Sequence, residues 1–127
     1  MLRCQSLVTN KITSSTKLSN QFANDIQFSP DSRHVAIAFG NTIHIFTFET
    51  MKRTHTYNPT NSKFVITKLM WNPIADKLQI ISVDLQRNIV VFDYIINKVI
   101  AMSETGNGGT DCCINKDGTL LVAVNNR

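Results

Sequence analysis

Residues 26–38 read IQFSPDSRHVAIA, an apolar triplet followed by a turn and an apolar run. The same order returns 43 residues later in residues 69–81, LMWNPIADKLQII, and again in residues 112–124, CCINKDGTLLVAV. Three copies keep one spacing without a gap, which chance does not readily produce. A repeat of about 40–45 residues predicts a fold made of similar units that stack on one another.

Each copy has the pattern of β-structure. Its apolar segments are short, rich in Val, Ile and Phe, and separated by Pro, Gly, Asn and Asp. In the second segment, Val35, Ile37 and Phe39 fall on one face. Ala36 and Ala38 fall on the other, so we expect both faces to be covered. The predicted strands are 24–28, 34–39, 42–48, 53–57, 67–71, 78–83, 89–94, 98–102, 110–114 and 120–125.

The turns give further detail. Ser29-Pro30-Asp31-Ser32 suits a type I turn, and Asp117-Gly118 supplies tolerance for positive φ. Between the second and third strands, residues 39–41 make a tight turn in copy one and residues 83–88 a longer one in copy two. Beyond it the sequence match resumes at a shift of 46, with residues 43–46 on residues 89–92.

The end of the second copy, residues 82–93 (SVDLQRNIVVFD), resembles the end of a WD repeat. In that family an aspartate turn leads to an alternating strand and a Trp-Asp pair, here Phe92-Asp93. The turns after Phe28 and Trp71 are also similar to the family's turn after its first strand. The family's Gly-His pair and network histidine are missing from these copies. The resemblance covers residues 24–127 and implies a β-propeller of four-stranded blades.

We therefore expect an all-β fold, a partial WD-repeat-like β-propeller of about two and a half four-stranded blades. Residues 1–23 are expected to form an N-terminal arm, or an outer strand around residues 5–8. Residues 24–127 are expected to form the incomplete propeller, with blades at 24–65 and 66–108 and a half blade at 109–127. Propellers have about 4–8 blades, so the rest of the ring is expected from a longer chain or a partner.

The resemblance also assigns blade positions. Phe28 and Trp71 share a repeat position and are expected in the core, as is Phe92. In WD repeats, aspartates at the positions of Asp84 and Asp93 hold turns by bonding nearby backbone N–H groups. An acid–base pair is the alternative interpretation of these two carboxylates.

The sequence predicts no catalytic, cofactor or metal site. His34, His44 and His55 lie ten or eleven residues apart in separate segments, which is not the pattern of a catalytic set. Cys112 and Cys113 are adjacent on a strand and point to opposite faces, so they cannot easily hold one ion. We expect a protein that is not an enzyme.

Composition limits the class of protein. The 127 residues are 43% hydrophobic and 17% charged, which suits one folded domain or a piece of one. No run approaches the roughly 20 apolar residues of a membrane-spanning helix, so membrane insertion is not expected. Three cysteines are too few for a disulfide scaffold, which favours the cytoplasm or nucleus. The first 23 residues lack acids and also suit a mitochondrial transit peptide, but their apolar residues make a poor amphipathic helix.

The implied function is a non-enzymatic protein–protein interaction scaffold, a WD-repeat subunit of a multiprotein complex. The segments that differ between copies, 52–63 and 84–88, are the expected contact loops. Lys52, Arg53, Lys63 and Arg87 are the candidate partner contacts within them.

The charge of the chain supports an alternative partner. The net charge is +4, and residues 1–63 hold seven basic residues against three acidic ones. The alternative is a nucleic-acid-associated propeller in an RNA-processing or ribosome-assembly particle, with binding that weakens steeply with salt. Only Lys52 and Arg53 adjoin in the sequence, so no basic block supports it. The basic residues available to it are Arg3, Lys11, Lys17, Lys52, Arg53 and Lys63.

Overall fold

The computed structural model describes residues 1–18, 22–58, 63–103 and 110–124. All regular elements in these ranges are β-strands, which confirms the all-β prediction. The described residues include no helix long and apolar enough to cross a membrane. The 108/109 blade boundary and residues 59–62 of the first expected contact loop lie outside these ranges.

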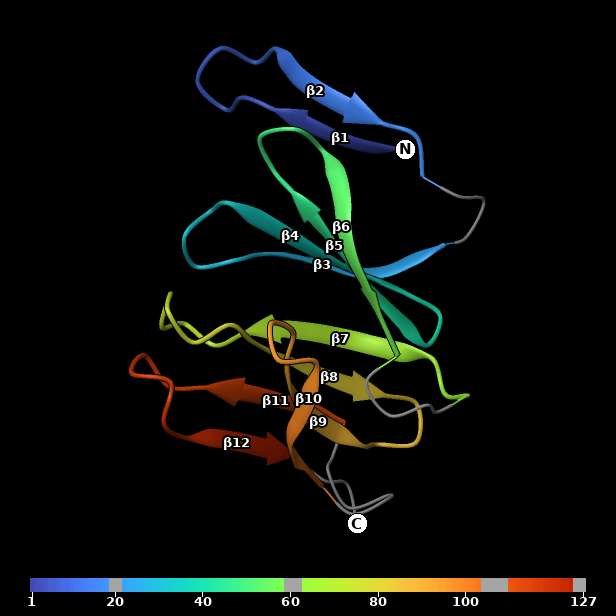
Figure 1. Ribbon diagram of the computed structural model, residues 1–127, viewed down its shortest axis with the longest axis vertical. Helices are drawn as coiled ribbons and strands as arrows, with labels where there is room; N and C mark the ends of the chain where they lie inside the picture. The colour runs from blue at the N-terminus through green and yellow to red at the C-terminus, as the bar shows by residue number, and fades with distance from the viewer. Residues whose placement is uncertain (19–21, 59–62, 104–109, 125–127) are drawn as a thin grey trace.

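Two four-stranded antiparallel sheets form the centre of the molecule (Figure 1). Their strands follow one another in chain order, so each sheet is a simple meander. The strands of the first sheet are β3 (Ala23–Phe28), β4 (His34–Phe39), β5 (Thr42–Thr47) and β6 (Lys52–Tyr57). Those of the second sheet are β7 (Ile66–Trp71), β8 (Gln79–Asp84), β9 (Ile89–Asp93) and β10 (Lys98–Met102).

A two-stranded unit lies at each end of these sheets. The N-terminal hairpin pairs β1 (Leu2–Gln5) with β2 (Ile12–Thr16). The C-terminal pair joins β11 (Asp111–Ile114) to β12 (Leu121–Val124). The four units follow one another down the molecule in chain order (Figure 1). The predicted strands of the two central sheets agree with the observed ones to within one residue at each end.

Three apolar layers separate the four units. The first lies between the N-terminal hairpin and the first sheet and includes Leu2 and Ile37. The second joins the two central sheets and includes Ile45 and Leu69. The third lies between the second sheet and the C-terminal pair and includes Cys112. Burial on both faces of β4 is confirmed, because its odd-numbered apolar residues pack in the first layer and its alanines in the second.

The predicted turns are present. The Ser32 N–H donates to the Ser29 carbonyl at 2.9 Å, which closes the Ser29–Ser32 turn. Ser29 Oγ donates to Asp31 Oδ1 at 2.6 Å and accepts the His34 N–H at 2.9 Å, so one hydroxyl ties the turn to β4. Gly118 has a φ of 69°, the left-handed conformation that its Asp-Gly position predicted.

The N-terminal segment differs from the expected arm or single outer strand. It is a hairpin in which β1 ends at Gln5 and residues 6–9 turn the chain. Ser6 Oγ accepts the backbone N–H groups of Val8 and Thr9 at 3.2 and 3.1 Å. Asn10 completes the turn with a φ of 57°, a conformation that asparagine tolerates well.

In the second sheet, the β8–β9 hairpin has a pairing register that differs by two residues from the register that the sequence match predicts. Phe46 pairs with Val35 in the first sheet. A shift of 46 aligns Phe46 with Phe92, and a shift of 43 aligns Val35 with Leu78. Phe92 would therefore be expected to pair with Leu78, but it pairs with Ile80. The longer turn after Val83 therefore moves β9 along β8 by two residues relative to the first sheet, a slide that preserves which side chains face which layer.

Phe28 is not in the core, contrary to the expectation from its repeat position. Its side chain is 55% exposed, whereas the matching Trp71 is 8% exposed. Phe28 pairs with Val35, so its side chain faces the hairpin side of the first sheet. There its ring meets Phe48 edge-on at a centroid distance of 5.5 Å, while the hairpin packs on β4, β5 and the β5–β6 turn.

Candidate functional site

Asp84 fixes the turn between β8 and β9. Its Oδ1 accepts the N–H groups of Gln86 at 2.9 Å and Asn88 at 3.0 Å. Its Oδ2 accepts the Asn88 side-chain amide at 2.9 Å. The carboxylate is buried, and Arg87 beside it has a φ of 65°. These bonds to its own turn give Asp84 a structural role.

Asp93 makes a similar but more exposed turn after β9. Its Oδ1 accepts the N–H groups of Ile95 at 3.0 Å and Ile96 at 3.2 Å. Asp84 and Asp93 lie at opposite ends of the β8–β9 pairing, since Asp84 ends β8 and Asp93 pairs with the first residue of that strand. The two carboxylates therefore do not form an acid–base pair.

Aromatic side chains join the two central sheets. The Trp71 indole N–H donates to the Gln27 carbonyl at 3.1 Å, and its ring meets Tyr94 edge-on at 5.6 Å. Phe92 is buried against Tyr57, with ring centroids 4.7 Å apart. Trp71 and Phe92 therefore lie in the layer between the two central sheets.

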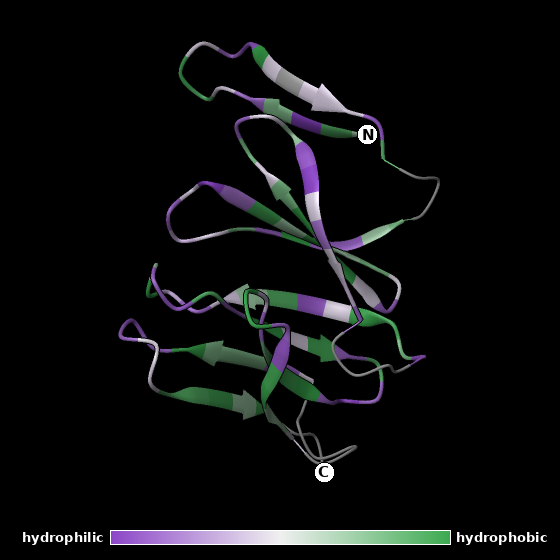
Figure 2. Cartoon of the chain, viewed as in Figure 1, coloured by the Kyte–Doolittle hydropathy of each residue, from purple (hydrophilic) through white to green (hydrophobic). Residues whose placement is uncertain are grey.

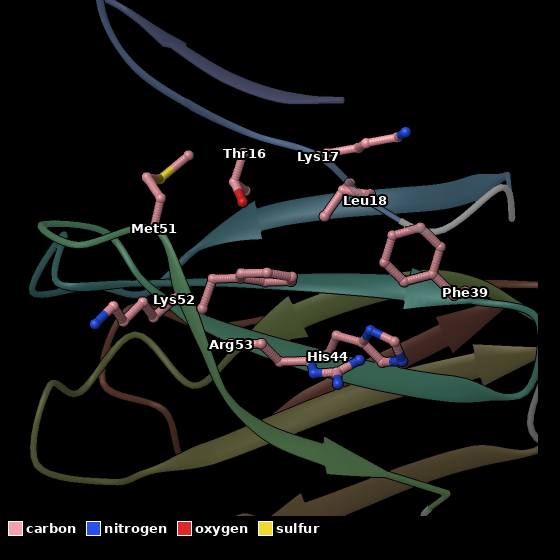
Figure 3. Close-up of a pocket in the computed structure, with 9 residues that line it drawn as sticks. Thr16, Lys17, Leu18, Phe39, His44, Met51, Lys52 and Arg53 are labelled. Carbon is pink, nitrogen blue, oxygen red and sulfur yellow. The ribbon is translucent and has the colours of Figure 1, made fainter.

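Three basic residues from two segments of the chain line one cleft between the N-terminal hairpin and the first sheet (Figure 3). Lys17 follows β2, and Lys52 and Arg53 begin β6. The cleft encloses about 490 Å³ and is walled by apolar side chains on several sides. Those apolar residues are Leu18, Phe39, Phe46 and Met51.

His44 lies in the same cleft, beside the Arg53 guanidinium (Figure 3). Its Nε2 is 3.4 Å from Thr42 Oγ1, and that hydroxyl donates to the Phe39 carbonyl at 2.9 Å. Burial lowers the pKa of His44, and the neighbouring Arg53 charge lowers it further. An electropositive site with a neutral imidazole at its base is suited to binding anions.

The other two candidate contacts lie elsewhere. Lys63 and Arg87 are both exposed and flank a different junction, where the Leu85 N–H donates to the Val65 carbonyl at 2.9 Å. The same junction holds a 2.7 Å bond from the Ile66 N–H to the Gly40 carbonyl. The candidate contacts therefore divide into two sets on two parts of the surface.

The cysteines are free thiols. Cys112 is buried, which raises the pKa of its thiol, and Cys113 is exposed. Within the ranges that the structure describes, no group of three or more His, Cys, Asp or Glu side chains is placed to hold a metal ion.

Sequence reasoning missed His44 as part of this site, and it did not place Lys17 beside Lys52 and Arg53. Both results depend on how the N-terminal hairpin docks, which no local pattern predicts. One signal was present: in the sequence match, His44 falls on Val90, so a polar residue replaces an apolar one.

A scan against protein-family models and a search of curated proteins found no match to this chain.

Proposed function

We propose that the chain is part of a WD-repeat-like β-propeller and acts as a non-enzymatic scaffold that binds other protein subunits. The observation that carries this proposal is the repeated way in which one sheet joins the next. Similar four-stranded meanders stacked face to face, with loops at their edges, are suited to displaying contact residues on a rigid body.

Equivalent residues make the two successive junctions. Asp25, Lys68 and Asp111 share one repeat position, with 43 residues from each to the next. Asp25 Oδ2 accepts the Leu69 N–H at 2.8 Å across the first junction. Lys68 crosses the second junction, where it pairs with Asp111 and donates to the Cys112 carbonyl at 3.3 Å. One repeat position thus links the first strand of one unit to the first strand of the next at both junctions, as expected of successive blades.

Exposed apolar residues on β3 support a further unit in the stack. Ile26 and Phe28 are 49% and 55% exposed on the hairpin side of the first sheet. The matching residues of β7, Leu69 and Trp71, are buried against the first sheet. In an assembled ring, another pair of strands would cover Ile26 and Phe28 in the same way.

The C-terminal pair has a similar exposed surface. All four residues of β12 are exposed and apolar, and the strand is coloured largely hydrophobic in Figure 2. Such a strand edge invites pairing with another strand. We propose that further strands cover β12 in the assembled protein, whether from a longer chain or from a partner.

The test is capture of the endogenous protein, with cross-linking and mass spectrometry, before and after nuclease treatment. The scaffold predicts stable protein partners that resist nuclease. A Lys63→Glu, Arg87→Glu variant should lose a partner bound at the β8–β9 turn, while Lys116→Glu, on the C-terminal pair, should not. Absence of stable protein partners would contradict the scaffold.

The cleft beside His44 favours the alternative of a nucleic-acid-associated propeller in one respect. It gathers Lys17, Lys52 and Arg53, three of the six basic residues that this function would use. Partners lost on nuclease treatment, together with binding that weakens steeply as salt rises, would favour this alternative. The free thiols are in keeping with either function in a reducing compartment such as the cytoplasm or nucleus.

A further inference from the structure

The cleft between the N-terminal hairpin and the first sheet is lined by residues of the β5–β6 hairpin. These residues differ chemically from their counterparts in the β9–β10 hairpin of the second sheet. The β5–β6 and β9–β10 hairpins can be aligned at their turns, because Thr47 pairs with Lys52 and Asp93 pairs with Lys98. Counted from these turns, Arg53 matches Val99, and each pairs with a buried phenylalanine of the neighbouring strand.

His44 differs from its counterpart in the same way. It stands two residues before Phe46, as Val90 stands two residues before Phe92. Val90 is buried, and Val99 is packed against the layer between the sheets. Two valines of the second sheet are thus replaced in the first sheet by an imidazole and a guanidinium. Val99 lines a cleft of its own beside Lys98, so the two places differ in the chemistry of their lining.

The positive charge of this cleft is not balanced by neighbouring acids. Its lining contains Lys17, Lys52, Arg53 and His44 and no carboxylate. Within the described part of the chain, the one ion pair joins Lys68 to Asp111, so neither Glu49 in the adjacent turn nor any other described acid pairs with these cations. Figure 3 shows Lys17 and Lys52 extending outward on two sides of the cleft, while Arg53 lies against His44.

The hydrogen bonds around His44 determine where its proton lies. The Thr42 hydroxyl uses its proton on the Phe39 carbonyl, so it can only accept from His44 Nε2–H. A neutral ring that donates its Nε2–H to this hydroxyl leaves Nδ1 able to take a second proton. An anion in the cleft would favour that second proton, because it would offset the repulsion between the imidazolium and Arg53.

We propose that this cleft binds a phosphate monoester dianion, held by the Arg53 guanidinium and the His44 imidazolium, with Lys17 and Lys52 raising the local positive potential. The planar guanidinium fork matches two phosphate oxygens, and a protonated Nδ1 supplies a further charge-assisted donor. This site does not depend on the chain being part of a propeller.

A phosphate monoester fits these residues better than a nucleic-acid backbone. A diester strand needs a track of cations, but Arg3 and Lys11 on the N-terminal hairpin do not line the cleft. A monoester needs one compact cluster of donors, which is what Arg53 and His44 provide.

The test uses the full 127-residue chain with inorganic phosphate and with O-phospho-L-serine, followed by NMR of the His44 side chain. We expect saturable shifts at His44 and a His44 pKa that rises in the presence of either probe. Tighter binding of O-phospho-L-serine would indicate a phosphorylated side chain as the ligand, and equal binding would indicate free phosphate. Shifts that do not saturate, or a His44 pKa unchanged by both probes, would overturn the proposal.

Variants give the decisive comparison. A His44→Val, Arg53→Val variant copies the second sheet and should weaken binding at least about tenfold, since it removes two charge-assisted hydrogen bonds. Lys98→Ala, the counterpart of Lys52 in the second sheet, should leave binding unchanged. If the amide spectrum shows that the double variant does not fold, Arg53→Gln provides the same test. Equal losses of binding in the Arg53→Gln and Arg3→Ala variants would overturn the phosphate site. The site would also be overturned if an oligoribonucleotide bound more tightly than the phosphate probes and this binding depended on Arg3 and Lys11.

Discussion

The Tyr57 hydroxyl donates a 2.6 Å hydrogen bond to the main-chain carbonyl of Tyr94. This buried bond ties the last residue of β6 to the turn after β9. At the other edge of the same junction, Asp25 accepts the Leu69 N–H. The two central sheets are therefore joined between their first strands, β3 and β7, and again between the end of β6 and the turn after β9.

Removing the Tyr57 hydroxyl should weaken this junction. Tyr57→Phe leaves the ring packing against Phe92 and deletes one donor, so we expect a loss of about 1–2 kcal/mol in the free energy of unfolding. Urea denaturation followed by tyrosine and tryptophan fluorescence measures it. Thr56→Val, at an exposed position of the same strand, should change stability by less than about 0.5 kcal/mol. Equal effects of the two changes would contradict the role of the bond.

The same hydroxyl predicts a dependence of stability on pH. Burial, together with the nearby Tyr94 and Asp93, raises the pKa of Tyr57 from 10.0 to about 12. The folded state holds this proton more tightly than the unfolded chain, so the contribution is complete below about pH 10 and is lost as pH rises toward 12. Unfolding free energies at pH 8, 10 and 11 should fall for the wild type and fall less for Tyr57→Phe. Parallel curves would contradict this prediction.

Two glycines form a matched pair for testing the turns. Gly40 and Gly118 have φ values of 55° and 69°. A Cβ on Gly40 would meet open space, whereas one on Gly118 would lie 2.2 Å from Asn72 Oδ1. The Asn72 side chain is buried and donates to Gln79 and to the Gly118 carbonyl, so it cannot move aside easily.

Alanine should therefore be tolerated differently at these two positions. Gly40→Ala is expected to lose about 1 kcal/mol, from its left-handed backbone alone. Gly118→Ala should lose roughly 2–4 kcal/mol, because it also displaces Asn72 from its hydrogen bonds. Urea denaturation of the two variants compares them directly. A Gly118→Ala loss no larger than that of Gly40→Ala would mean that Asn72 is not fixed as described.

Asp84 offers a test of the turn between β8 and β9. Asp84→Ala should lose roughly 2–4 kcal/mol, since it leaves buried amide groups of Asn88 without an acceptor. Asp84→Asn keeps one side-chain oxygen and should lose less. Asp76→Ala, at an exposed position, is the control. If Asp84→Ala matched the control in urea denaturation, the turn would not depend on its carboxylate.

The sequence was sufficient for the strands of the two central sheets, because repetition reinforced each local pattern. The alternation around Ile37 predicted both covered faces of β4, and the Asp-Gly pair predicted the conformation of Gly118. Repetition also produced the error at Phe28. A repeat position indicates which way a side chain points, but its burial depends on whether a neighbouring unit covers it.

The cleft could not be predicted, because it depends on contacts between segments far apart in the sequence. His44 and Arg53 come together through the pairing of β5 with β6, and Lys17 joins them only because the N-terminal hairpin docks on the first sheet. The two-residue shift of β9 along β8 could not be predicted from the sequence either. Alternating apolar residues fit either register with the same faces covered, so the length of the turn decides between them.

The proposed stack predicts that Ile26 and Phe28 are covered in the assembled protein. The most direct test is the rate of maleimide labelling of a Phe28→Cys variant, in the isolated chain and in the captured complex, with an Asp76→Cys variant at an exposed turn as the reference. We expect fast labelling in the isolated chain and strong protection in the complex. Equally fast labelling in both, relative to the Asp76→Cys reference, would contradict the stack.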